Sequence, residues 1–362
     1  MTKPRIETTV VGSYPVPDWL TALPSEQALV DATRVVLHTQ ERAGIDLVCD
    51  GELYRFDVNH PETNGMIEYF VRPLSGVRTT VTFDELVAFR AKRGMGFRTR
   101  PPAVVEGPIG CGFLDLPQAC ARAKRLATCP LKFTLTGPHM LAKTLLDTHY
   151  KSVPDVAMAI ADALAEQVRH LDADVVQIDE ANLPGSPDEW PWAADAINRV
   201  LDAVQTVSAV HLCFGNYGGQ SIQKGDWAQL LSYLNALHAD HVLLETAHRP
   251  PDELTVFRDL RPEIGIGLGV VDIKSTVIES AEAIARWLER AEAALGRDRV
   301  KYINPDCGFW MLKRTIADGK IRALVAGRDL YEGRIGPQNA AAQQNAVKPL
   351  PQPGTMRAEF TH

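Results

Sequence analysis

The sequence predicts an α/β protein with a TIM (β/α)8 barrel, and three patterns support this fold class. Eight short runs of β-branched and apolar residues recur along the chain, and helical patterns separate most of them. The runs are mostly apolar instead of alternating, which is typical of parallel strands covered on both faces. Polar residues stand where several runs end. Because TIM-barrel sites lie at the carboxyl ends of the strands, these residues predict one functional rim.

The eight expected strands follow one another through most of the chain. They span residues 6–13, 45–52, 131–137, 173–180, 208–214, 240–246, 264–271 and 300–307. Eight strands that alternate with helices favour a closed barrel over an open, doubly wound sheet.

Two of the intervening helices carry clear end signals. The helical pattern over 152–171 opens with Ser152 and Pro154, which suit the N-terminal cap and the first turn. The pattern over 280–296 closes with Gly296, a residue that favours the position just beyond a helix end. Both helices are therefore expected between strands.

One interval is too long for a single crossover. Residues 72–130, between the second and third expected strands, include basic and Pro/Gly-rich pieces and are interpreted as an inserted excursion. A hairpin-and-helix cap over the active face and an oligomer contact are both compatible with this segment. We expect residues 1–345 to form a single catalytic barrel that includes this excursion, followed by an extended, Pro-rich tail over 346–362.

Composition and charge exclude several classes of protein. The chain has 362 residues and a net charge of −7. This charge lacks the positive excess that is typical of proteins that bind nucleic acid or an anionic membrane. No apolar stretch reaches the roughly 18 residues that a membrane-spanning helix needs. The N-terminal segment lacks a hydrophobic signal core, so we expect a cytoplasmic enzyme.

The cysteines do not predict a disulfide framework. All six cysteines of the chain are widely and irregularly spaced. Cys111, Cys120 and Cys129 are evenly spaced, but no His or acidic residue accompanies them at ligand spacing. We interpret these three as ordinary thiols.

Four side chains at expected strand ends predict a zinc site: His211, Cys213, Glu245 and Cys307. His211 and Cys213 are two positions apart, so in a strand both side chains point to the same face. Glu245 and Cys307 each end their own apolar run. Zinc accepts nitrogen, sulfur and carboxylate oxygen in tetrahedral sites. The prediction depends on the fold bringing these strand ends together, and a closed, purely structural zinc site is the alternative.

Six short motifs occur in an order that resembles a known family. They are VGSYP, DGE followed by NGMIEYF, QIDE, HLC, ET and NPDCGF. Together they resemble the catalytic C-terminal barrel of cobalamin-independent methionine synthase, from about residue 6 to about residue 325, with 72–130 poorly covered. The chain is similar to a stand-alone form of that barrel. The resemblance implies that the four residues above bind Zn²⁺, which deprotonates a substrate thiol.

The resemblance also implies an amino-acid site for homocysteine. Gly12 and Ser13 match the loop that holds the amino-acid carboxylate, and Glu52 and Asp179 match the acids that hold its ammonium group. The alternatives are a simple turn cap for Ser13 and ordinary ion pairs with barrel Arg or Lys residues for the two acids. Glu180 follows Asp179 and would point away from the site, so a structural role is expected for it.

The motif after the seventh expected strand departs from the family. Asp272-Ile273-Lys274-Ser275 stands where the family has Asp-Ile-His-Ser, whose His is the suspected acid for the departing folate nitrogen. We expect Asp272 and Lys274 to serve the chemistry at this position. A Lys, with a pKa of about 10.4, is a poorer acid at neutral pH than a His near 6.5. Lys274 could instead clamp an anionic substrate.

A second departure follows the third expected strand, where the family places a Trp that stacks on the pterin. This chain has TGPHMLAKTLLDTHY over 136–150. His149, Tyr150 and Trp310 are candidate replacements. The residues that recognise the thiol are therefore better matched than those that recognise the methyl donor.

We expect a zinc-dependent methyltransferase that makes methionine from homocysteine, with 5-methyltetrahydrofolate or another methyl carrier as donor. An accessory methyl-donor protein and a homo-oligomer are compatible with the sequence. The alternative is a thiol alkyltransferase of the epoxyalkane:coenzyme M transferase type, in which Lys274 or the Arg-rich stretch 90–100 would hold the sulfonate. A third interpretation is a zinc-stabilised barrel that binds a thiol without turnover.

Overall fold

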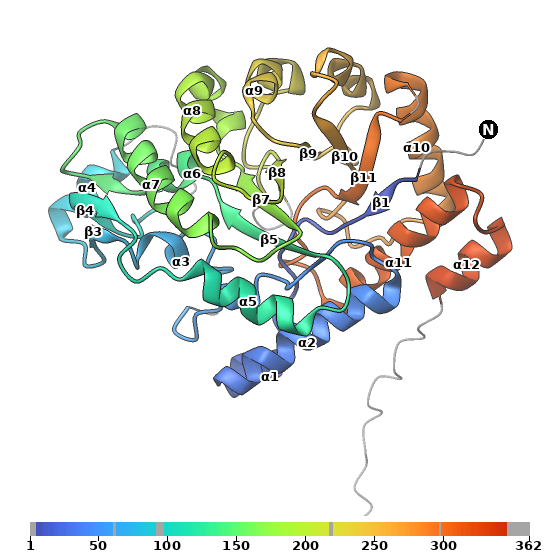
Figure 1. The fold of residues 1–362 in the computed structure, drawn as a ribbon, viewed down its shortest axis with the longest axis horizontal. Helices are drawn as coiled ribbons and strands as arrows, with labels where there is room; N and C mark the ends of the chain where they lie inside the picture. Colours follow the sequence, from blue (N-terminus) through green and yellow to red (C-terminus); the bar gives the residue numbers. More distant parts are fainter. Residues whose placement is uncertain (1–4, 61–62, 92–97, 217–219, 297, 346–362) are drawn as a thin grey trace, which may run out of the picture.

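The computed structural model describes residues 5–60, 63–91, 98–216, 220–296 and 298–345. The tail expected over 346–362 and part of the Arg-rich stretch 90–100 lie outside the described residues. The described chain forms a ring of strands inside a layer of helices (Figure 1). The α/β barrel class predicted from the sequence is confirmed.

All eight barrel strands lie inside the expected runs or begin within one residue of them, and neighbouring strands run parallel. In chain order they are β1 (Glu7–Thr8), β2 (Val48–Cys49), β5 (Leu131–Thr136), β7 (Val175–Glu180), β8 (Val207–Leu212), β9 (His241–Leu244), β10 (Gly265–Val271) and β11 (Val300–Pro305). Hydrogen-bonded neighbours follow the order β1-β11-β10-β9-β8-β7-β5-β2. A parallel bridge between Thr9 and Leu47 joins the two ends of this order and closes the barrel.

Longer helices surround the strands because each buries one apolar face against the barrel. These are α2 (Glu26–Ala43), α5 (Leu116–Leu126), α7 (Val153–Val168), α8 (Trp190–Leu201), α10 (Ala281–Leu295) and α11 (Arg314–Tyr331). Ser152 and Ser280 cap α7 and α10 by accepting hydrogen bonds from Asp155 N and Ala283 N. Gly296, with φ of 91°, ends α10 as the sequence predicted.

Shorter elements complete the loops of the barrel. They are α1 (Asp18–Ala22), η1 (Leu53–Arg55), α3 (Glu68–Val71), α6 (Pro138–Thr144), η2 (Leu183–Gly185), η3 (Pro187–Glu189), η4 (Trp227–Leu230), α9 (Leu231–Ala236), η5 (Pro251–Asp259) and α12 (Pro337–Asn345). The last of these packs on α11 at the edge of the molecule (Figure 1).

The long interval between the second and third barrel strands contributes two strands to a small sheet beside the barrel, and the third strand of that sheet follows β5 (Figure 1). Strand β3 (Ser75–Arg78) pairs antiparallel with β4 (Val104–Gly110), which pairs parallel with β6 (Leu146–Asp147). Helix α4 (Phe83–Arg90) follows β3 and begins with a capping box between Thr82 and Glu85. A cavity of about 610 Å³ lies between this excursion and the loop after β2.

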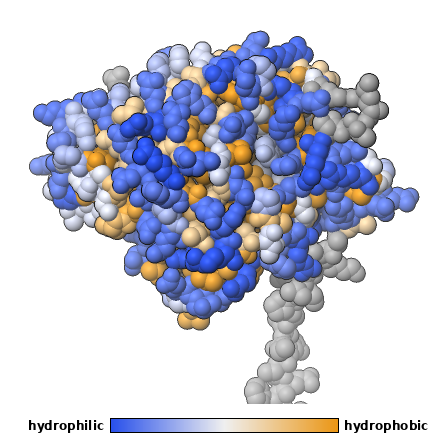
Figure 2. Space-filling model, in the orientation of Figure 1, coloured by the Kyte–Doolittle hydropathy of each residue, from blue (hydrophilic) through white to orange (hydrophobic). Residues whose placement is uncertain are grey.

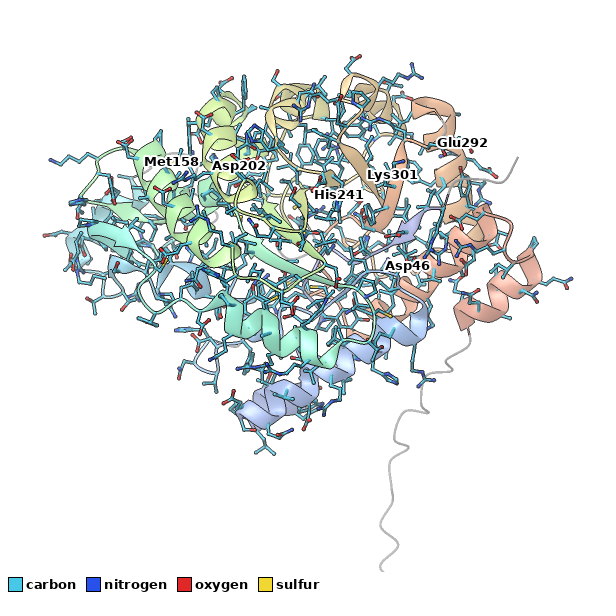
Figure 3. All side chains as sticks on the ribbon, viewed as in Figure 1. Asp46, Met158, Asp202, His241, Glu292 and Lys301 are labelled. Atoms are coloured by element: carbon cyan, nitrogen blue, oxygen red, sulfur yellow. The ribbon has the colours of Figure 1, made fainter. Side chains whose placement is uncertain are left out.

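The barrel interior combines an apolar layer with buried polar groups. Leu47, Val175, Ala209 and Leu243 form one buried cluster against Tyr302. His241 on β9, labelled in Figure 3, stacks on Tyr302 with ring centroids 4.4 Å apart. The buried Lys132 ammonium donates a hydrogen bond to the Val10 carbonyl, and burial lowers the pKa of Lys132 to about 8.

The surface is mostly polar. The face in Figure 2 carries mainly hydrophilic side chains, with hydrophobic residues scattered between them. Within the described ranges, no helix combines the length and apolar character that crossing a bilayer requires.

Candidate metal centre

Three strand ends bring the expected metal ligands to one edge of the barrel, the rim, where the carboxyl ends of the strands meet. His211 lies on β8, Cys213 immediately follows that strand, and Cys307 lies two residues beyond β11. Strand register sets Asp179 beside His211 and His211 beside Leu243, two residues before Glu245. The parallel fold therefore juxtaposes residues that are far apart in sequence.

His211, Cys213 and Cys307 form a cluster whose ligand atoms all lie within 4.8 Å of one another. The Cys213 and Cys307 Sγ atoms are 3.7 Å apart. Nδ1 of His211 lies 3.1 Å from the Leu243 carbonyl, an arrangement that fixes the proton on Nδ1. Nε2 of His211 is buried and has no hydrogen-bond partner in the described part of the chain. An unprotonated Nε2 is the form that binds a metal.

The two thiols of this cluster are electrostatically unequal. The Cys213 thiol, His211 and Lys274 lower the pKa of Cys307 well below its ordinary value, despite burial. Cys307, together with burial, raises the pKa of Cys213 well above its ordinary value. The pair therefore readily carries one thiolate. One imidazole nitrogen and two sulfurs form a donor set that fits zinc.

The fourth expected ligand, Glu245, lies next to the cluster but is not one of its members. Its carboxylate is fully buried, and Oε1 accepts a hydrogen bond of 2.9 Å from Lys274 Nζ. Oε2 accepts a hydrogen bond of 3.1 Å from the Phe214 N–H. Its charge still reaches the cluster, because it contributes to the raised pKa of Cys213. Glu245 is thus bound to an ammonium group at the edge of the cluster.

Lys274 is buried in the site, since only 2% of its side chain is exposed. Burial lowers the pKa of Lys274, but Glu245 and the two cysteine sulfurs outweigh this effect and raise it above the ordinary value. Lys274 is consequently a cation and a weak acid.

Asp272 organises the loop that presents Lys274. Its Oδ1 accepts a hydrogen bond of 2.8 Å from the Lys274 N–H, and its Oδ2 lies 3.3 Å from Nδ1 of His248. The buried Lys320 ammonium donates to the Asp272 carbonyl at 2.9 Å and to both carboxylate oxygens of Glu279. These bonds fix the start and the end of the loop.

Asp306 is a site residue that sequence reasoning missed. Its buried carboxylate accepts 2.8 Å hydrogen bonds from the N–H groups of Thr246, Ala247 and His248, which directly follow Glu245. Burial and the nearby Glu245 raise the pKa of Asp306 to about 8. Gly269 is required here, because a Cβ atom would overlap Asp306 Oδ1. The only sequence signal was an acid directly before the expected ligand Cys307.

Glu52, an expected ammonium acceptor, is already paired. Its Oε2 lies 3.0 Å from Nη1 of the fully buried Arg55, and its Oε1 accepts a 2.7 Å hydrogen bond from Thr134 Oγ1. Glu52 itself has a left-handed backbone with φ of 59°. Gly12 admits its carboxylate, because a Cβ atom at Gly12 would overlap Glu52 Oε1. The ion-pair alternative thus describes part of the role of Glu52.

Asp179, the second expected acceptor, has no ion pair with Lys or Arg among the residues that the structure describes. Its Oδ1 accepts a hydrogen bond of 2.7 Å from Gln177 Nε2. Burial and the charge of Glu52 raise the pKa of Asp179 to about 7. Ser13 is buried nearby on the rim and lines a small hollow together with Glu52 and Trp310.

Glu180 and Tyr150 are both held by structural contacts. Glu180 accepts hydrogen bonds from the N–H groups of Met140, Asn182 and Leu183, which fits the structural role expected for it. Tyr150 accepts a hydrogen bond from Ile109 N on β4 and so belongs to the excursion. Trp310 is the one candidate replacement for the pterin-stacking Trp that lines the hollow beside Ser13, within the described ranges.

Comparisons with known proteins identify the family and agree with the fold. Residues 6–328 match the family model for the catalytic domain of cobalamin-independent synthase. A methionine synthase of Sulfurisphaera tokodaii is 26% identical over 96% of this chain and 98% of that protein. The 2-hydroxypropyl-CoM lyase of Xanthobacter autotrophicus is 28% identical over 93% of this chain and 98% of its own length.

A solved structure has the same architecture. The B12-independent methionine synthase from Shewanella sp. W3-18-1, in complex with selenomethionine, superimposes with a TM-score of 0.76 at 26% sequence identity. The match covers 91% of this chain and 99% of that one.

Proposed function

This chain belongs to the family of cobalamin-independent synthase catalytic domains, and on that premise we propose that it is a zinc-dependent methyltransferase that converts homocysteine to methionine. The observation that carries the proposal is the buried convergence of His211, Cys213 and Cys307 at the rim. The similar methionine synthases, one of them in complex with selenomethionine, support methionine as the product.

The proposed metal ligands are His211, Cys213, Glu245 and Cys307, with Zn²⁺ as the cofactor. A zinc ion bound by these residues lowers the pKa of a substrate thiol, which is otherwise about 8.5, and so supplies a nucleophile at neutral pH. The Leu243 carbonyl holds the His211 ring in the tautomer that this role needs. Lys274 and Glu245 set the charge at the edge of the cluster.

Asp179, Glu52 and Arg55 are proposed to select an amino-acid thiol. With both acids ionised these groups carry one net negative charge, which matches the single ammonium group of homocysteine. Glu52 is neutralised by Arg55, so Asp179 supplies the uncompensated charge. Gly12 and Ser13 adjoin Glu52 and are assigned to the amino-acid carboxylate.

The proposed methyl donor is 5-methyltetrahydrofolate or another methyl carrier, delivered free or by an accessory protein. Lys274 cannot replace the family His as an efficient acid, because its pKa is raised and its ammonium is bound to Glu245. We assign Lys274 and Asp272 to the arrangement and charge of the site. A donor whose leaving group needs no protonation would suit this chain best.

A second candidate function is thiol alkylation of the epoxyalkane:coenzyme M transferase type, favoured by the similarity to 2-hydroxypropyl-CoM lyase. Coenzyme M carries a sulfonate and lacks an ammonium group, so Asp179 would repel it. The buried cation Lys274 is committed to Glu245. The charges at the rim therefore favour homocysteine.

The experiment that tests the proposal is mass-spectrometric product analysis of the zinc-loaded protein. Homocysteine is supplied with 5-methyltetrahydrofolate or with methylcobalamin, and coenzyme M is supplied with an epoxide in parallel. The proposal predicts repeated turnover to methionine with at least one methyl donor. Turnover of coenzyme M with no methionine from either donor would assign the chain to the second function.

A further inference from the structure

The side chain of Gln177 joins the two halves of the proposed amino-acid site. It lies on β7 two residues before Asp179, so both side chains point to the same face of the strand. Its Nε2 donates a hydrogen bond of 2.7 Å to Asp179 Oδ1 and one of 2.8 Å to the Val11 carbonyl. Val11 directly precedes Gly12 and Ser13. One amide nitrogen therefore contacts both the proposed ammonium acceptor and the backbone that leads into the proposed carboxylate loop.

The segment Gly12–Ser13 is held from two directions. Gln177 binds the carbonyl of Val11, which lies beyond the end of β1. The Phe309 N–H donates a hydrogen bond of 2.8 Å to the Ser13 carbonyl. The Phe309 contact ties the segment to the loop after β11, whereas the Gln177 contact ties it to Asp179 on β7. The separation of the two halves of the site thus depends on Gln177.

The burial of Gln177 points to a role for its amide nitrogen. The side chain is fully buried, and its Oε1 has no hydrogen-bond partner among the residues that the structure describes. A buried carbonyl oxygen without a partner costs free energy, which an apolar side chain at this position would avoid. The two hydrogen bonds that Nε2 donates, to Asp179 and to Val11, are the contacts that offset this cost.

An α-amino acid carries its ammonium and carboxylate groups on one carbon atom, so the two acceptors must stand at a fixed separation. Acceptors that are already placed bind such a ligand without first having to be ordered. We propose that Gln177 is a positioning residue that holds Asp179 and the Gly12–Ser13 segment at the separation that homocysteine requires. It thereby favours thiols that carry both charged groups over thiols that carry one. The inference rests on the proposed homocysteine function.

The test is the Gln177→Met variant of the full chain, in which the side chain keeps its length and loses the amide. Gln167→Met is the matched control, because Gln167 accepts a hydrogen bond from Leu116 N between helices α7 and α5, outside the barrel. Three thiols are titrated into the zinc-loaded proteins by calorimetry. They are homocysteine, mercaptobutyrate, which lacks the amino group, and aminopropanethiol, which lacks the carboxylate. The zinc content of each sample is measured first.

The expected result is a selective loss of homocysteine affinity, because a thiol with one charged group needs only one acceptor in place. Gln177→Met should bind homocysteine at least about tenfold more weakly and each of the other thiols less than about threefold more weakly, on the scale of a misplaced charged contact. Gln167→Met should bind all three thiols as the wild type does. Equal weakening of the three thiols, or an unchanged homocysteine affinity, would overturn the role of Gln177.

A second variant keeps the proposal testable if Gln177→Met does not fold. Gln177→Asn retains a buried amide but is one carbon shorter, so its nitrogen cannot reach Asp179 and Val11 together. It should show the same selective loss of homocysteine. A wild type that binds all three thiols equally would refute the proposed homocysteine function, and this inference with it. A wild-type preference for homocysteine that both Gln177 variants retain would refute the role of Gln177 alone.

Discussion

The Sγ atoms of Cys213 and Cys307 lie 3.7 Å apart, although 94 residues separate them in the sequence. Parallel strands β8 and β11 deliver them to the same rim, and His211 on β8 brings its unpartnered Nε2 to the same point. Packing alone is a poor explanation for this convergence, because burying a polar atom such as His211 Nε2 without a hydrogen-bond partner costs free energy.

Replacement of Cys307 by Ser should abolish zinc binding and activity together. A serine hydroxyl is a poor zinc ligand at neutral pH, whereas the Cys213 thiol and His211 hold the pKa of Cys307 well below its ordinary value. Metal content after dialysis and methionine production are the measurements. Cys129→Ser, at a half-buried thiol away from the rim, should retain both. Full zinc content and full turnover in Cys307→Ser would show that the cluster is not the metal site.

Replacement of Asp179 by Asn should raise KM for homocysteine about 10–100-fold, as expected for a lost charged contact. kcat should change less, because Asp179 contacts the ammonium group and not the sulfur. Steady-state kinetics of the wild type and of Asp179→Asn provide the check. An unchanged KM would remove Asp179 from substrate recognition.

The same residue predicts a pH dependence. Burial and the charge of Glu52 raise the pKa of Asp179 to about 7, so the carboxylate is mostly protonated at pH 6 and mostly ionised at pH 8. Binding of the ammonium group needs the ionised form, and homocysteine affinity should therefore rise with pH across this window. Equilibrium titrations from pH 6 to pH 8 should show this increase in the wild type, with a smaller one in Asp179→Asn. Parallel profiles in the two proteins would contradict the assignment.

Replacement of Asp306 by Ala should lower the free energy of unfolding by about 2–4 kcal/mol, because one buried and two part-buried N–H groups lose their acceptor. Zinc affinity should fall as well, since the backbone beyond Glu245 loosens. Asp306→Asn, which keeps a carbonyl acceptor, should cost less on both measures. Chemical denaturation of the metal-free protein separates the stability effect from metal binding. Equal stability of Asp306→Ala and the wild type would refute this role.

Asp46 gives a prediction about stability that is independent of the site. It lies between β1 and helix α11 (Figure 3), where its Oδ2 accepts hydrogen bonds from Thr8 N and from Arg328 Nη1 at 2.9 and 2.6 Å. Burial raises the pKa of Asp46, but these donors outweigh it and lower the pKa below its usual value. Asp46→Asn should cost about 2–3 kcal/mol at pH 7.

The sign of the pH effect follows from this lowered pKa. The carboxylate stabilises the fold fully above the unfolded-state pKa of about 3.9, and the contribution is lost as pH falls through the lower folded-state pKa. The difference in unfolding free energy between wild type and Asp46→Asn should therefore shrink below about pH 3. Denaturation at pH 7 and pH 3 measures it. A difference that grows on acidification would contradict the assignment of the bonds.

The barrel could be predicted from the sequence because strand periodicity is local. All eight runs became parallel strands, and the chain positions of His211, Cys213 and Cys307 at strand ends were enough to predict their meeting. Partners contributed by another part of the chain could not be predicted. Asp306 binds backbone 58 to 60 residues away, and nothing local in the sequence selects these N–H groups.

The partners in two buried ion pairs could not be predicted from the sequence either. The sequence indicated that Lys274 and Glu245 lie near the same rim, but it gave no reason to pair them with each other instead of with substrate and metal. Arg55, which neutralises Glu52, was not singled out at all. In both pairs the choice of partner depends on side-chain direction inside a closed barrel, which residue type and spacing do not determine.

The number of sulfur neighbours of bound zinc, measured by X-ray absorption with and without homocysteine, tests whether the metal binds the substrate thiol. We expect two sulfur neighbours, from Cys213 and Cys307, in the zinc-loaded protein and three after homocysteine is added. Serine in place of homocysteine is the control, since it has the same amino-acid groups without the thiol, and it should leave two. A count that stays at two with saturating homocysteine would contradict the claim that this site activates a substrate thiol on zinc.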